Sequence, residues 1–319
     1  MRTSGLSCLP VALFVIVVCG CAGVGQVSPQ SHFSALQTPG NTSVSHRVKP
    51  DKASYLKALY VAELSNGVVK ILSNTYYREL GTITTGITAP VAATLDQLGN
   101  LYVANQSPGS IAEYAPGATS PSFTYTAGIT TPFGVAVDNH GNVYEVDATG
   151  SINQYFQGFD HVAQACSVPG SGTAAVGVTV DSNNDVFVGD YNGSFATIQE
   201  YQGGLHGCNP TAFSFGVNGV ATFAMDKNAD LIFSDPLSGG GVFVVAPPYT
   251  SITRTIGSGF VQPLGVSLNK KNTLAFVADA KTGTVTVVNY QTGTNVTVLG
   301  PEHGITAAYG VVDGRNAVY

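Results

Sequence analysis

The sequence predicts an all-β fold, a six-bladed β-propeller with four antiparallel strands in each blade. A unit of two apolar runs joined by a turn recurs six times along the chain. Successive units lie 42 to 45 residues apart, which is the period expected of one blade per repeat. The segments between the units show strand and turn patterns only. The turns begin at Asp96, Asp138, Asp181, Asp226, Asn269 and Asp313.

Composition limits the classes of partner. Charged residues make up 10% of the chain, against about 25% in an average soluble domain. The net charge is −6, and no Lys or Arg occurs between Glu79 and Asp226. A basic stripe for phosphates cannot form there, so nucleic acid is not expected as a partner. The chain contains no Trp, which removes the Trp-Asp signature of one large propeller class.

Residues 1–21 have the pattern of an export signal. Arg2 precedes an apolar core, Leu9 to Val18, which is too short to span a bilayer. The following segment, Val18-Cys-Gly-Cys-Ala22, resembles a bacterial lipobox. The resemblance implies lipidation of Cys21 and an extracytoplasmic protein anchored at the bacterial cell envelope. Plain secretion and an uncleaved anchor are the alternatives. Residues 22–54 are rich in Ser, Thr, Pro and Gly and are expected to form a flexible tether, followed by the propeller at 55–319.

The first strand of each unit alternates bulky and small residues. Val135 and Val137 alternate with Gly134 and Ala136, and the other units follow the same rule. Small residues are expected where six innermost strands crowd around one axis. The acidic residue that opens each turn can bond the turn's own backbone. The fourth turn position requires a positive φ, so Ala229 at that position predicts local strain or a different turn.

The remaining strands follow at regular intervals. The second strands are apolar on both faces because each blade packs on two neighbours. Third strands are expected near 67–72, 110–115, 151–156, 196–201, 241–246 and 283–289, and outer fourth strands near 78–84, 122–126, 160–166, 210–215, 252–256 and 295–299. The chain begins at a second strand near Leu59, and the matching first strand, Tyr309 to Asp313, comes last. A closing blade shared by both ends is therefore predicted. Asn316 to Tyr319 is expected to be peripheral.

The repeat, Pro-x-Gly-Val-x-Val-Asp-x-x-Gly-Asn-Val-Tyr-x-x-Asp, resembles the NHL repeat of six-bladed propellers. Its best units are Pro90–Asn105 and Pro132–Asp147. The stretch Tyr114-Ala-Pro-Gly-Ala118 is also similar to repeats of bacterial surface lipoproteins of this type. The resemblance implies the fold. It leaves the function open, since the family includes RNA binders, lyases, lactonases and scaffolds.

The clearest candidates for binding lie at the ends of the second strands. These polar residues are Glu63, Asn105, Asp147, Asp190, Asp235 and Asp279. They form either an acidic rim or a set of turn caps, and the repeat itself favours turn caps. Glu145 breaks the repeat, because the other blades have Val or Phe there. A buried carboxylate in an apolar row is costly unless it is paired or protonated. Glu145 therefore faces water or the central channel, where it could line a binding site, or it has a specific partner. A tolerated, partly solvated substitution is the favoured interpretation.

Other motifs are weak. Cys166 and Cys208 occupy matching outer positions on adjacent blades, and a disulfide is predicted, with free thiols or a metal pair as alternatives. The stretch Asp181 to Asp185 opens like a calcium loop but lacks the Gly and Glu that an EF-hand requires. The six His residues form no ligand spacing, so no metal and no cofactor are expected.

The leading hypothesis is a non-catalytic, surface-tethered propeller that binds a protein or glycan through one face. Polar loops at 105–110, 190–196 and 235–241 suit wet contacts. The alternative is a divergent metal-dependent lactonase or lyase that uses Glu145 and the polar residues at the second-strand ends. Propeller lactonases hold their metal at the starts of the first strands, where this chain offers only Asn218 and Gln262. A purely structural spacer is the third possibility.

Overall fold

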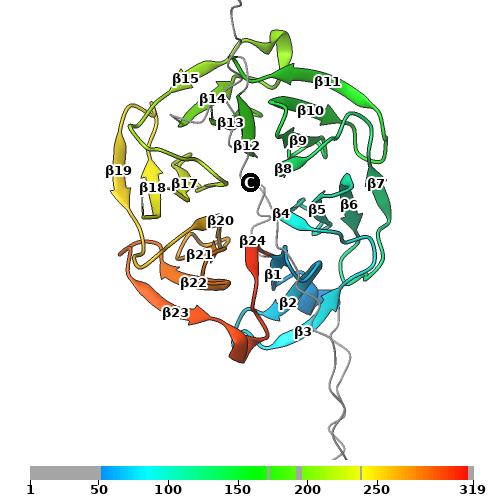
Figure 1. Ribbon diagram of the computed structural model, residues 1–319, viewed down its shortest axis with the longest axis vertical. Helices are drawn as coiled ribbons and strands as arrows, with labels where there is room; N and C mark the ends of the chain where they lie inside the picture. The colour runs from blue at the N-terminus through cyan, green and yellow to red at the C-terminus, as the bar shows by residue number, and fades with distance from the viewer. Residues whose placement is uncertain (1–51, 171–172, 192–195, 238, 315–319) are drawn as a thin grey trace, which may run out of the picture. The chain divides into compact units, whose positions relative to one another are not determined.

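The computed structural model describes residues 52–170, 173–191, 196–237 and 239–314. Within these residues, 24 strands form six antiparallel four-stranded sheets around a central axis, which confirms the predicted six-bladed propeller (Figure 1). Helix is confined to α1 (Lys52–Tyr55) and two 3₁₀ turns, η1 (His206–Cys208) and η2 (Pro301–His303). The predicted signal peptide, nearly all of the tether and Asn316–Tyr319 lie outside the described residues.

The strand bounds agree with the expected segments to within a few residues. Counted from the axis outward, the closing blade holds β24 (Ala308–Asp313), β1 (Ala58–Glu63), β2 (Val68–Ser73) and β3 (Glu79–Ile83). The second blade holds β4 (Pro90–Leu95), β5 (Leu101–Gln106), β6 (Gly109–Tyr114) and β7 (Phe123–Tyr125). The third holds β8 (Pro132–Val137), β9 (Val143–Asp147), β10 (Ser151–Tyr155) and β11 (Val162–Ser167).

The remaining blades repeat the same order. The fourth blade holds β12 (Ala174–Val180), β13 (Val186–Tyr191), β14 (Ala196–Tyr201) and β15 (Thr211–Phe213). The fifth holds β16 (Phe223–Met225), β17 (Leu231–Asp235), β18 (Gly241–Val245) and β19 (Ile252–Thr255). The sixth holds β20 (Pro263–Leu268), β21 (Leu274–Asp279), β22 (Thr284–Asn289) and β23 (Asn295–Leu299).

The ring closes as the out-of-phase repeat predicts. The last strand, β24, pairs antiparallel with the first, β1, and Leu59 lies opposite Asp313. In Figure 1 the red strand β24 therefore lies beside the blue strand β1. This pairing places the two ends of the described chain in one sheet and removes the open edge that an incomplete blade would leave.

The inner turns follow one geometry. The Asp96 carboxylate accepts hydrogen bonds from the backbone N–H groups of Leu98 (2.9 Å) and Asn100 (2.8 Å). The equivalent bonds recur in the turns that begin at Asp138, Asp181 and Asp226. The turn at Asn269 is one residue longer, and the Asn269 side-chain oxygen accepts from the N–H groups of Thr273 and Leu274. Ala229 keeps the common turn and adopts φ 63°, so the strain predicted there is present and the turn type is unchanged.

Small residues on the inner strands face the next blade. A Cβ on Gly177 would collide with the carbonyl oxygen of Ala221, and one on Gly265 would lie 2.9 Å from the carbonyl oxygen of Tyr309. Thr222 instead bonds across the gap: its hydroxyl donates to the carbonyl of Leu264 (2.6 Å) and accepts from Val266 N–H. The small residues are therefore required by the close approach of neighbouring inner strands.

The core lies between adjacent blades. In one cluster, Tyr144 and Val146 of β9 pack with Val186 and Val188 of β13, and all four are at most 2% exposed. Because each blade buries both faces in this way, its second strand is mainly apolar, with Glu145 of β9 as the charged exception in mid-strand. The polar residues at the strand ends then lie where the blades meet the loops.

Candidate functional site

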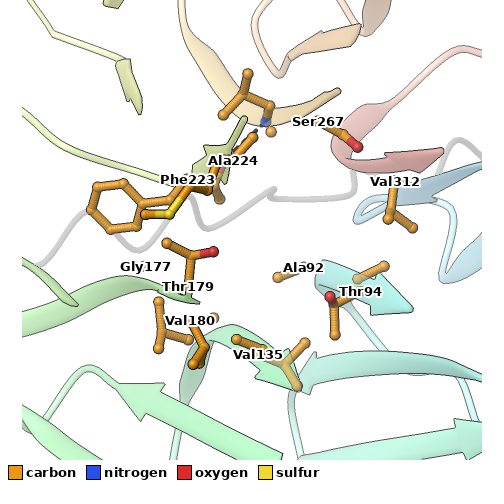
Figure 2. Close-up of a pocket in the computed structure, with 18 of the residues that line it drawn as sticks. Ala92, Thr94, Val135, Gly177, Thr179, Val180, Phe223, Ala224, Ser267 and Val312 are labelled. Carbon is orange, nitrogen blue, oxygen red and sulfur yellow. Dashed lines mark hydrogen bonds between the residues drawn. The ribbon is translucent and has the colours of Figure 1, made fainter. Parts of the chain in front are cut away.

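A cavity of about 380 Å³ lies on the propeller axis. Inner-strand residues line it, and the side chains of Thr94, Thr179 and Ser267 contribute hydroxyl groups (Figure 2). The lining reaches the inner turns of the fourth and fifth blades, where Asp181 and Asp226 lie. Both carboxylates bond their own turns. The volume of the axial cavity falls in the range of small-molecule pockets, and the cavity wall consists of aliphatic, hydroxyl and backbone groups.

Two faces surround this cavity. One side of the propeller carries the inner turns and the hairpins between third and fourth strands, and we call this side the turn face. These hairpins adjoin the inner turns: the Tyr249 hydroxyl donates to the Ala229 carbonyl (3.0 Å), and the Gln291 amide donates to the Asn272 carbonyl (3.0 Å). We call the opposite side the loop face. It carries the loops between second and third strands and the connections between blades.

The six polar residues at the ends of the second strands lie beneath the loop face. All are buried, with at most 4% of each residue exposed. The sequence favoured turn caps, and Asp147, Asp235 and Asp279 do accept a bond from the N–H two residues later. These caps are only part of the arrangement. Four of the six polar side chains, two of the caps among them, bond the segment that leads into the first strand of their blade.

These bonds connect distant parts of each blade. Glu63 accepts from the backbone N–H groups of Thr306 (2.6 Å) and Ala307 (3.1 Å). Equivalent bonds join Asn105 to Thr88 N–H, Asp235 to Asn218 N–H, and Asp279 to the N–H groups of Val261 and Gln262. The polar residues therefore fix the loops of this face. Because all six side chains are buried, they do not form an exposed acidic rim. Their role in binding stays a prediction.

The third and fourth blades depart from this arrangement. Asp147 bonds Thr149, and its Oδ2 has no hydrogen-bond partner among the described residues. Asp190 accepts from the Thr197 hydroxyl (2.7 Å) and the Gln199 amide (2.6 Å) on β14. The loop between β13 and β14 includes residues 192–195, which lie outside the described part, and residue 238 of the 235–241 loop does too.

Glu145 is fully buried and has a specific partner. Its Oε2 accepts a hydrogen bond from the Asn153 amide (2.8 Å), while Oε1 has no partner within the described residues. Burial raises the pKa of Glu145 to about 8; the Asn153 bond opposes this rise and the Asp147 charge adds to it. Glu145 is not among the residues that line the axial cavity. The structure shows the specific partner, and the alternative of a partly solvated carboxylate is wrong because Glu145 is fully buried. A binding role for Glu145 stays a prediction.

Cys166 and Cys208 form a disulfide, with their Cα atoms 5.4 Å apart. The bond joins β11 of the third blade to η1 of the fourth blade. The Cys166–Cys208 pair therefore links two adjacent blades covalently near their outer edge.

Exposed apolar side chains on the turn face are the feature that the sequence reasoning missed. Tyr76, Leu98, Phe156 and Phe159 are 71%, 72%, 56% and 66% exposed. A signal was present in the repeat. Positions equivalent to Phe156 hold Ala115, Gln202 and Ala246, and those equivalent to Phe159 hold Ala118 or the buried residues Leu205 and Tyr249. Aligning the hairpins between third and fourth strands would have shown two extra aromatic residues in the third blade.

Together these features define a six-bladed β-propeller with an axial cavity and an internally braced loop face. A chain of the crystal structure of a nidogen/laminin complex is similar, with a TM-score of 0.67 and 15% sequence identity. The match covers 82% of this chain and 100% of that chain, and at this identity it shows the fold alone. No family model and no curated protein matches the sequence.

Among the described residues, no three or more His, Cys, Asp or Glu side chains lie together so as to hold a metal ion. The described residues also include no helix with the length and hydropathy that a membrane crossing requires.

Proposed function

We propose that this protein is a non-catalytic, surface-tethered propeller that binds a partner through its loop face. The observation that carries the proposal is the set of buried polar side chains beneath that face. In four of the six blades they bond the backbone of the connections on this face from below, which preorganises those connections before a partner arrives. Preorganised loops lower the entropic cost of binding, which favours recognition.

A protein is the partner that we favour. The matched solved chain belongs to a complex of two proteins, nidogen and laminin, which supports this choice by analogy of fold. The exposed loop-face residues are mainly polar and uncharged, such as Ser65, Ser107 and Thr282. Such residues suit a wet, hydrogen-bonded contact, and a glycan is the second ligand class that they fit.

The tether is the other half of the proposal. The apolar segment Leu9 to Val18 and the lipobox-like Cys21 support export and lipidation at a bacterial cell envelope. Lipidation at Cys21 places a spacer of about 30 residues between the anchor and the propeller, long enough for the loop face to meet partners outside the envelope.

Cross-linking to partners in envelope extracts tests the loop face. We expect Ser107→Arg and Thr282→Arg to weaken capture at least about tenfold, since each places a long charged side chain in a polar contact. The matched control is Ser182→Arg on the turn face, which should capture the partner as the natural protein does. Equal capture by all three variants would contradict the proposal. So would hydrolysis of lactones or esters that is lost on changing Thr179 in the axial cavity.

A further inference from the structure

We propose that the turn face rests on the surface of a lipid membrane that contains anionic lipids. This inference rests on the surface tethering proposed above and adds the orientation of the propeller. It assigns the turn face to lipid and leaves the loop face for the partner.

The first argument is the distribution of exposed apolar side chains. Among the described residues, the exposed aromatic side chains of Tyr76, Phe156 and Phe159 all lie on hairpins of the turn face, and Leu98 lies on an inner turn there. The other large exposed apolar residues are valines on the loop face or on the outer strand β23. Aromatic side chains that project from one face suit the boundary between lipid headgroups and acyl chains.

The Phe156–Phe159 hairpin is held rigidly. The Phe159 N–H donates to the Phe156 carbonyl (3.1 Å), so both side chains project from one tight turn. Between them, the Gln157 amide donates to the Tyr102 hydroxyl (3.0 Å) and Gly158 N–H donates to the Tyr125 hydroxyl (3.0 Å). A turn bonded in this way to the second blade cannot fold inward to bury the two phenyl rings.

The second argument is charge. Lys227, Lys270 and Lys271 lie exposed on inner turns of the fifth and sixth blades. The neighbouring Asp226 carboxylate is buried in its turn and Asp230 is half-buried, so this part of the turn face is positive although the chain as a whole is acidic. Lysines at this position complement an anionic lipid surface.

The third argument is where the tether joins the propeller. Tyr55 and Leu56 come directly before β1 and lie against the second blade's turn-face loops, near Gly117 and Gly99. The Tyr60 hydroxyl donates to the Tyr55 carbonyl (2.9 Å), which fixes this entry. The first described residues of the propeller, at α1, therefore lie on the same face that carries the aromatic residues and lysines.

Tryptophan reporters give a direct test because the natural chain has no Trp. The full chain, carrying Phe159→Trp, is reconstituted into vesicles of phosphatidylcholine and phosphatidylglycerol with brominated acyl chains. Phe156→Trp serves as a second turn-face reporter, and Val261→Trp on the loop face, where Val261 is 50% exposed, is the matched control. We expect a blue shift and about twofold quenching at Phe159→Trp and Phe156→Trp, with unchanged emission at Val261→Trp.

Charge is tested on the same reporter. In the Phe159→Trp background, Lys227→Gln, Lys270→Gln and Lys271→Gln together should shift the ratio of docked to undocked protein about 100-fold toward undocked, taking about 1 kcal/mol for each lysine. Vesicles of phosphatidylcholine alone should give the same loss of quenching. High salt should reduce quenching in the Phe159→Trp chain that keeps its three lysines, because salt screens their charge.

The outcomes separate this inference from the proposed tethering. A chain that floats with the vesicles while Phe159→Trp stays unquenched retains the tether and overturns the docking. Equal quenching of Phe159→Trp and Val261→Trp also overturns it, since no face is then preferred. A chain that does not float with the vesicles overturns both proposals. A Phe159→Trp shift that requires an envelope protein and is absent with lipid alone assigns the turn face to a protein and contradicts lipid docking.

Discussion

Glu145 is a residue that departs from the repeat and does not line the axial cavity. It lies in a row where the other blades have Val or Phe, and a stretch free of Lys and Arg surrounds it in the sequence. Glu145 is buried, accepts one hydrogen bond from the Asn153 amide and lies near the Asp147 carboxylate, so the folded protein favours its neutral form.

This preference makes stability depend on pH. In the unfolded chain the Glu145 carboxyl has its ordinary pKa of 4.5, and in the folded protein about 8. The folded state therefore binds the extra proton between these values, and stability falls as pH rises from about 5 to 8, by up to about 1.4 kcal/mol per unit. We expect Glu145→Gln to flatten this slope in urea unfolding measured across that range. Glu79→Gln, at an exposed site whose ion-pair partner is Lys70, is the control and should leave the slope unchanged. An unaltered slope in Glu145→Gln would contradict the assignment.

The sequence showed that Glu145 was unusual but not where its side chain goes. The period-2 pattern placed it on a second strand correctly. Its partner Asn153 lies on the next strand, opposite Glu145. This pairing depends on the register of β9 and β10, and sequence spacing alone does not fix that register to within one residue. The same limit applied to Phe156 and Phe159, whose exposure depends on how the hairpin packs against the second blade.

At the scale of elements, the bond between β11 and η1 is the covalent link between blades. Without it, the outer strand of the third blade would meet the fourth blade only through side-chain packing and single bonds such as that from the Gln164 amide to the Leu205 carbonyl (2.5 Å). Cys166 and Cys208 lie 19 and 18 residues beyond Asp147 and Asp190, and these similar outer positions in adjacent blades made the pair visible in the sequence.

Removing this link should lower stability. For two Cys residues 42 apart, constraint of the unfolded chain predicts a loss of about 3–4 kcal/mol in the double variant Cys166→Ser/Cys208→Ser. Guanidinium unfolding, with and without a reductant, measures this loss. The reductant should destabilise the natural protein by a similar amount and leave the double variant unaffected. Equal unfolding midpoints for the two proteins would show that the link does not contribute.

Strand positions were largely predictable for a physical reason. Each blade buries both faces of its second strand and crowds its first strand against the next blade, so both leave strong patterns of apolar and small residues. Outer strands leave weaker patterns because solvent covers one side. The loop bracing by Glu63 and Asp279 was not visible, since their partners are backbone N–H groups, which every sequence has.

For the whole molecule, the decisive contact is the pairing of β24 with β1. It joins residues that are about 250 positions apart and completes both the closing blade and the ring. The inner strand β24 also contacts both neighbouring inner strands: a Cβ on Gly310 would meet the Val91 carbonyl oxygen at 2.9 Å, and Ser267 accepts from Asp313 N–H (3.2 Å).

Truncation tests the role of this pairing. A chain that ends at Thr306 lacks β24, and we expect it to lose the single cooperative unfolding transition and to become sensitive to protease, because β1 is left with a free edge. A chain that ends at Gly314 keeps β24 and is the control; it should unfold as the natural protein does. A cooperative transition in the shorter chain would show that five complete blades suffice.

The shared blade also sets the order of events when the protein is made. Because β1 emerges near the start of the propeller and its partner at the far end, no intermediate length of chain can satisfy the backbone groups along the inner edge of β1. Until synthesis is nearly finished, the free edge of β1 can pair with strands of other incomplete or newly synthesised chains. The yield of correctly assembled protein then depends on how crowded the newly made chains are during that interval.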